Sequence, residues 1–128
     1  MDILLTNINW LAVIIGAVAS FALGWLWYSP KMFGTKWATG SGMTLEPGTK
    51  MPMLAMVAQA GSTFVLAWAV GVAKALELVP LALLFTVAIM GLIKANALFA
   101  KKNFYAVAVE TGFIAAMVAV MLLAHAVV

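Results

Sequence analysis

The sequence predicts an all-α, polytopic membrane protein with four transmembrane helices in an up-down bundle and a short interfacial helix after the first span. Of its 128 residues, 66% are hydrophobic and only 9% are charged, whereas about 25% of the residues of a soluble domain are charged. The apolar residues fall into four stretches, each close to the ~20 residues that a helix needs to cross a bilayer. The whole chain, residues 1–128, is therefore expected to form a single transmembrane domain.

The first apolar stretch covers about residues 8–28 and is followed by the one long connection, residues 29–52, which is rich in Gly, Thr, Ser and Lys. The remaining stretches cover about residues 53–73, 79–100 and 104–126. Only a few residues separate them from one another. Short connections of this kind join antiparallel neighbours, so the last three spans are expected to run up and down through the membrane.

The interfacial helix is predicted from the residues that directly follow the first span. Ser29 is suited to an N-cap and Pro30 to the first helical position, so a short helix is expected to run from there to about Ala38. Phe33 and Trp37 are four residues apart and would share its apolar face. This pattern predicts a helix that lies along the membrane surface, inside the connection 29–52.

Lysines predict the orientation of the bundle. Five of the six lysines outside the spans occur in the first and third connections: Lys31, Lys36, Lys50, Lys101 and Lys102. The second connection holds Lys74 beside Glu77. Because cytoplasmic loops collect positive charge, connections 29–52 and 101–103 are expected in the cytoplasm and both termini outside.

The aromatic motif that ends the first span carries a resemblance to a known family. Trp27 and Tyr28 suit the headgroup region, where amphipathic rings accumulate. The motif comprises Gly24, Trp27, Tyr28, Ser29, Pro30, Phe33, Gly34 and Trp37. On these residues the chain resembles the bacterial family called domain of unknown function 1761. The resemblance implies a small four-span protein of the bacterial cytoplasmic (inner) membrane, and it implies no activity.

Small residues recur at every fourth position on two of the predicted spans. Such stripes allow helix backbones to approach closely. The stripes are Gly16, Ser20 and Gly24 on the first span, and Ala108, Gly112 and Ala116 on the fourth. Packing inside the bundle is the default interpretation, although either stripe could serve a homo-oligomer.

One lysine and one glutamate fall inside the spans. Lys94 lies seven residues before Lys101, and Glu110 lies eight residues after Lys102, so both sit about 10 to 12 Å below the corner that joins the last two spans. Charges within a membrane usually pair with one another, which predicts a Lys94–Glu110 contact. A structural pair, a proton or cation site, and an anion or headgroup site are all compatible with it. Gln59, Asn96 and Thr111 could extend the polar group.

Several classes of site are excluded or disfavoured by composition. The chain has no cysteine and a single histidine, which excludes disulfides, thiolate sites and multi-histidine metal sites. His125, one turn after Met121, could ligate a haem or pigment, but a histidine at the aqueous boundary is the favoured interpretation, and no cofactor is expected. The scattered lysines argue against nucleic acid, and no nucleophile-and-base set or phosphate-binding glycine loop is present.

The predicted function is therefore non-catalytic. The leading hypothesis is an integral membrane protein, surrounded by membrane lipids, that self-associates or serves as an accessory or structural subunit of a larger complex. The alternative is a small channel or an ion- or proton-coupled transporter that uses Lys94 and Glu110. An intramembrane charge with solvent access would favour transport, and one sealed by its neighbours would favour the accessory role.

Overall fold

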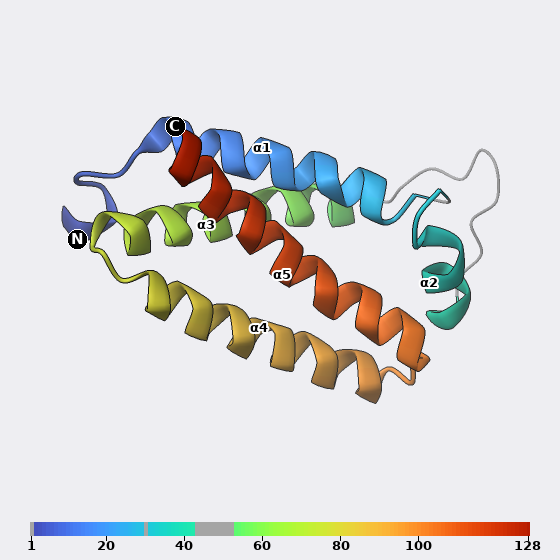
Figure 1. Cartoon of the computed structure of the whole chain (residues 1–128). Helices are drawn as coiled ribbons and strands as arrows, with labels where there is room; N and C mark the ends of the chain where they lie inside the picture. Colours follow the sequence, from blue (N-terminus) through green and yellow to red (C-terminus); the bar gives the residue numbers. More distant parts are fainter. Residues whose placement is uncertain (1, 30, 43–52) are drawn as a thin grey trace.

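The computed structural model describes residues 2–29, 31–42 and 53–128 and is all-α within them (Figure 1). A 3-10 turn at Asp2–Leu4 precedes the five helices. They are α1 (Trp10–Trp27), α2 (Gly34–Gly40), α3 (Met53–Ala75), α4 (Val79–Phe99) and α5 (Phe104–Val127).

The prediction of four long apolar helices with a short helix after the first is confirmed. α1, α3, α4 and α5 are each long and apolar enough to cross a membrane, and their limits differ from the predicted ones by at most two residues. This is therefore a multi-pass membrane protein by the length and composition of its helices.

α5 is the central helix of the bundle. It packs against α1 on one side and α4 on the other, while α3 packs mainly against α1. In Figure 1, the end of α3 and the start of α4 lie together at their short turn, and the two helices diverge toward the end that carries α2. The core follows this arrangement, because α5 contributes more buried side chains than any other helix, among them Phe113, Met117, Met121 and Ala124.

The small-residue stripe on α1 is used inside the bundle. A Cβ on Gly16 would lie 3.2 Å from the Met121 backbone, and one on Gly24 would lie 3.1 Å from the Phe113 ring. Between them, the buried Ser20 hydroxyl donates to the Met117 carbonyl oxygen at 3.4 Å. The close approach of α1 and α5 is thus the reason for small residues at these three positions.

The corresponding stripe predicted on α5 is only partly involved. Gly112 faces the Trp27 ring, which would lie 3.5 Å from a Cβ at this position, whereas Ala116 is half-buried and Ala108 is exposed. The face that meets α1 is formed instead by larger residues, namely Phe113, Met117 and Met121. Small residues are needed on only one of two helices when bulky side chains of the other fill the space above them.

Two helix ends have a charged residue where glycine is usual. Glu77, two residues past the end of α3, has φ 58°, and Lys101, two residues past the end of α4, has φ 61°. The following amides close the motif, since Leu78 N–H donates to the Ala73 carbonyl at 2.7 Å and Lys102 N–H donates to the Ala97 carbonyl at 3.1 Å. Both turns are therefore Schellman caps with an unfavourable left-handed residue.

α2 folds back onto the bundle. A Cβ on Gly34 would collide with the Tyr28 carbonyl, and one on Gly40 would collide with the Asn103 side chain. Asn103 N–H donates to the Gly40 carbonyl at 3.0 Å, and its side chain accepts from the Ala106 amide at 2.8 Å to cap α5. The two glycines thus allow α2 to join the end of α1 to the start of α5.

The predicted start of this helix is wrong. α2 begins at Gly34, with Phe33 as its N-cap residue, and the proposed first residue, Pro30, lies outside the described residues. The Ser29 hydroxyl does not cap α2 but donates to the Leu26 carbonyl at 2.7 Å. Residues 31–33 belong instead to a turn before α2, and the Gly34 amide donates to the Ser29 carbonyl at 2.9 Å.

Candidate functional site

Glu110 is the acidic side chain around which the α2 end is organised. It lies on α5 and its side chain is 18% exposed. The Trp37 indole N–H, from α2, donates to Glu110 Oε2 at 3.1 Å. Lys102 Nζ, from the α4–α5 corner, donates to the same oxygen at 2.7 Å. A single carboxylate oxygen thus links α2, α5 and the corner.

Aromatic rings of the α1–α2 motif surround this carboxylate. Tyr28 contacts Trp37 edge-on at 4.8 Å and Phe113 edge-on at 5.3 Å between ring centroids. Trp27 packs against Phe33 at 4.8 Å. Its indole N–H donates to the Val109 carbonyl at 3.0 Å, one residue before Glu110 in the chain. Edge-to-face pairs of this kind each contribute about 1 kcal/mol beyond their buried area, so the motif is a packed cap over the start of α5.

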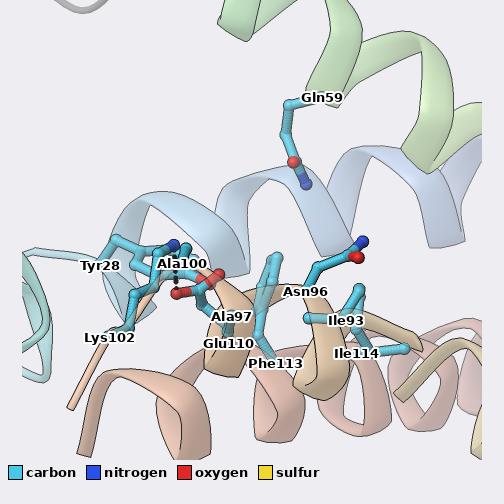
Figure 2. A pocket seen from close by; sticks show the side chains of 10 residues that line it. All are labelled: Tyr28, Gln59, Ile93, Asn96, Ala97, Ala100, Lys102, Glu110, Phe113 and Ile114. Carbon is cyan, nitrogen blue, oxygen red and sulfur yellow. Dashed lines mark hydrogen bonds and ion pairs between the residues drawn. The ribbon is translucent and has the colours of Figure 1, made fainter. Parts of the chain in front are cut away.

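A polar cavity lies beside the capped carboxylate. Its volume is about 450 Å³, and it is lined by Tyr28, Gln59, Ile93, Asn96, Ala97, Ala100, Lys102, Glu110, Phe113 and Ile114. Figure 2 shows Gln59 of α3 pointing toward it from across the bundle, while the amide of Asn96 on α4 extends away from the Glu110–Lys102 pair. The polar cavity therefore draws side chains from α3, α4, α5 and the end of α1.

Comparison with known proteins identifies the family. The family described as "Protein of unknown function (DUF1761)" matches residues 11–126 of the chain. The chain belongs to this family. No curated protein and no solved structure matches it.

In this DUF1761 protein the aromatic motif has a different place from the one that its composition predicts. The sequence predicts Phe33 and Trp37 on a face turned toward lipid. Trp37 instead turns inward to Glu110, and Phe33 packs on Trp27. The buried residues of α2 are Gly34 and Ala38, which let the short helix lie close against α5.

The prediction that Lys94 is the cation paired with Glu110 is wrong. Glu110 pairs with Lys102, whereas Lys94 is exposed and makes no ion pair among the described residues. The reason is the face of α4 on which Lys94 lies. The α4 residues that line the polar cavity are three or four positions apart, namely Ile93, Asn96, Ala97 and Ala100, and Lys94 lies about 100° around the helix from Ile93.

The other predicted members of the polar site separate into two groups. Gln59 and Asn96 line the polar cavity with Glu110, and the Gln59 amide also donates to the Thr63 hydroxyl at 3.3 Å. Thr111 is not among the lining residues, because its hydroxyl donates to the Val107 carbonyl of its own helix at 2.7 Å.

His125 and Met121 lie in different environments. Met121 is 1% exposed within the core, whereas His125 is half-buried and its Nε2 atom has no hydrogen-bond partner among the described residues. No group of three or more potential metal ligands of the His, Cys, Asp and Glu types occurs in the described part of the chain.

Lys102 and Trp37 are the site residues that sequence reasoning did not assign. The sequence uses Lys102 only to orient the bundle, and Trp37 only as a membrane anchor. A signal for Lys102 was available: a long side chain directly before the N-cap of a helix can fold over its first turns toward an acid. No spacing rule connects Trp37 with Glu110, because they are 73 positions apart.

Proposed function

We propose that this protein is a non-catalytic integral membrane protein of the bacterial cytoplasmic membrane that works by association within the bilayer, in the first place with a second copy of itself. Service as an accessory subunit of a larger complex is the other form of the same hypothesis. No nucleic acid is involved, and the remaining surface contacts membrane lipids.

The observation that supports association is a pair of outward-facing glycines. A Cβ on Gly61 of α3 or on Gly91 of α4 would have no heavy atom within 4 Å. Their small size is therefore not needed inside this bundle, unlike that of Gly16 and Gly24. Glycine on a membrane-spanning helix surface allows close approach of another helix. The neighbouring exposed Ser62 and Lys94 add polar groups that favour protein over hydrocarbon.

Single-cysteine cross-linking in native membranes tests this proposal, because the chain has no cysteine of its own. Ser62→Cys or Gly91→Cys should give disulfide-linked dimers on mild oxidation, since residues close to the axis of a two-fold interface meet their own counterparts. Val18→Cys on α1 is the matched control, as its side chain is 65% exposed among aliphatic neighbours and should stay monomeric.

The outcomes separate the two forms of the hypothesis. Adducts with a different protein at Ser62 or Gly91 would replace the second copy by another subunit. Equal dimer formation at Val18 would show random collision, and a monomer at all three positions would contradict association altogether.

The orientation is proposed with both termini outside. The hydrogen bond between Asn103 and Gly40 supports it, because it joins the first and third connections at one end of the bundle, and these two connections hold five lysines. Cysteines placed at exposed Thr35 and Glu77 should react with an impermeant thiol reagent from the inner and outer side, respectively. Labelling of Thr35→Cys in intact cells would contradict this topology.

A second candidate function is proton or cation passage, and the polar cavity favours it. Glu110 borders a cavity that also contains Tyr28, Gln59 and Asn96, so the carboxylate is not sealed by its neighbours. Its ion pair with Lys102 already provides the carboxylate with a cation, which argues against binding of a further cation there. Flux into liposomes that is abolished by Glu110→Gln but retained in Glu77→Gln would establish this candidate, and the absence of flux under imposed proton and sodium gradients would reject it.

A further inference from the structure

We propose that the polar cavity binds the headgroup of a zwitterionic phospholipid that carries a primary ammonium, as phosphatidylethanolamine does. The inference concerns a ligand site on the α2 end and does not depend on the association proposed above.

The charges bordering the polar cavity are balanced. Lys102 and Glu110 contribute one positive and one negative charge, and among the described residues no other ionisable acid or lysine lines it. A ligand with a net charge would be repelled by whichever of these two side chains carries a charge of the same sign. A zwitterion can instead place its anionic group by Lys102 and its cationic group by Glu110, which satisfies both charges.

The hydrogen-bonding capacity of the pair is only partly used. Glu110 Oε2 accepts from both Lys102 and Trp37, whereas Oε1 has no hydrogen bond among the described residues. A lysine ammonium has three N–H donors, and one of those of Lys102 is directed to Glu110. The pair thus retains an acceptor for an ammonium N–H and two donors for phosphate oxygens.

The depth of the polar cavity suits a lipid headgroup. α5 begins at Phe104, so Glu110 lies about 9 Å along the helix axis. Lys102 lies above it at the corner. The hydrocarbon core is about 30 Å thick and the bilayer with its headgroups about 40–45 Å. A helix of 24 residues is longer than the core alone, which places the ion pair close to the boundary between headgroups and acyl chains.

The walls of the polar cavity combine an apolar part and a polar part, as a phospholipid does. Ile93, Phe113 and Ile114 provide apolar surface below the ion pair, while Gln59 and Asn96 provide amides. Glycerol and ester oxygens of a lipid can accept from these amides. A small water-soluble zwitterion would leave the apolar surface unused.

The acyl chains also have a path away from the polar cavity. α3 and α4 diverge toward this end of the bundle (Figure 1). Val57 of α3 and Leu92 of α4 are exposed, so they offer apolar surface on which the chains can lie. The site is therefore open to a ligand that remains anchored in the bilayer.

The free Oε1 acceptor also distinguishes the ammonium. A primary ammonium can donate to Glu110 Oε1, but the trimethylammonium of a choline headgroup has no N–H to donate. We therefore expect phosphatidylethanolamine to bind about tenfold more tightly than phosphatidylcholine with the same acyl chains, because one charge-assisted hydrogen bond contributes roughly 1.5 kcal/mol.

Native mass spectrometry of the detergent-purified full chain, titrated with each lipid, tests the proposal. The parent should show the tenfold preference for phosphatidylethanolamine. Glu110→Gln should abolish the preference, because it removes the anionic acceptor, and Lys102→Met should weaken both lipids. The matched controls Glu77→Gln and Lys101→Met lie outside the polar cavity and should leave the affinities unchanged.

Asn96→Phe tests the site without breaking the ion pair, in case Glu110→Gln or Lys102→Met prevents folding. Asn96 is exposed on α4 but lines the polar cavity, so a ring there should fill it and reduce binding at least tenfold without breaking the ion pair. Equal binding of the two lipids by the parent, or full binding by Asn96→Phe, would overturn the proposal.

Glycerophosphoethanolamine, the headgroup without acyl chains, identifies the source of the ligand. It should compete with phosphatidylethanolamine only at concentrations at least a hundredfold higher, because it lacks the apolar contacts. Competition at equal concentration would assign the site to a soluble zwitterion and would overturn the lipid assignment.

Discussion

The two ends of the bundle are held together by different kinds of contact. At the α2 end, an ion pair, two indole hydrogen bonds and a set of edge-to-face rings join α1, α2, α5 and the α4–α5 corner. At the opposite end, which carries both termini (Figure 1), Trp68 donates to the Leu4 carbonyl at 2.7 Å and packs on Trp10 at 5.7 Å. No ion pair occurs there among the described residues, although Lys74 and Glu77 share a turn.

The cavities of the two ends differ in the same way. The polar cavity at the α2 end is bordered by Glu110 and Lys102, whereas the cavity at the opposite end, of about 310 Å³, is lined by apolar and aromatic side chains such as Leu4, Trp68 and Phe85. Apolar packing tolerates substitutions of similar volume, whereas a desolvated polar network is sensitive to the loss of any member. Substitutions at the α2 end should therefore have the larger effects.

The largest effect is expected at Gly34. A Cβ there would meet the Tyr28 carbonyl, which is backbone and cannot move aside easily. Gly34→Ala should lower the free energy of unfolding by about 3 kcal/mol or detach α2, as measured by thermal unfolding in detergent and by protease sensitivity of the α1–α2 turn. Gly61→Ala, with open space around its Cβ, is the control and should not destabilise the isolated chain. Equal effects of the two would contradict the docking of α2.

A smaller loss of stability is expected from removing the Glu110 carboxylate. Glu110→Leu leaves the Trp37 N–H and the Lys102 ammonium without their acceptor, which should cost about 2 kcal/mol. Adding Lys102→Met should recover part of the loss, since the unpaired charge is gone. Glu77→Gln at the opposite end should change stability by less than about 0.5 kcal/mol. If the double variant is less stable than Glu110→Leu, the pair is not the origin of the loss.

The smallest effect is a gain in stability, and it should be similar at both ends of the bundle. Glu77 and Lys101 occupy left-handed cap positions that glycine adopts without steric cost. Glu77→Gly and Lys101→Gly should each stabilise the protein by about 0.5–1 kcal/mol, measured as a rise in the unfolding temperature. Alanine at the same positions serves as the control, because it removes the charge but keeps the Cβ, and a gain as large as that of glycine would show that charge rather than backbone strain decides.

The sequence was sufficient to predict the long helices but not the connection between the motif and Glu110. Hydrophobic runs of span length define α1, α3, α4 and α5 because crossing a bilayer needs a fixed number of apolar residues. The stripe of Gly16, Ser20 and Gly24 also predicted close packing, since small size has one main use inside a bundle.

The candidate site was harder to predict because it depends on side-chain direction and on a fold-back. Counting residues from the corner matched the depth of Lys94 and Glu110, but depth along the axis says nothing of the helix face, which separates these two residues and leaves Glu110 to pair with Lys102. The aromatic composition of α2 suited a lipid interface equally well. The fold-back of α2, with Gly34 close against the Tyr28 carbonyl and Trp37 bound to Glu110, cannot be read from composition.

A double-mutant cycle between Trp37 and Glu110 tests most directly whether the aromatic motif caps the carboxylate of Glu110. The cycle compares the unfolding free energies of Trp37→Phe, Glu110→Leu and the double variant in the same detergent. A second cycle, with Trp68→Phe in place of Trp37→Phe, provides the matched control, because Trp68 makes its indole hydrogen bond at the opposite end. We expect a coupling energy of about 1 kcal/mol in the first cycle and additivity within about 0.5 kcal/mol in the second. Additive effects of Trp37→Phe and Glu110→Leu would contradict it.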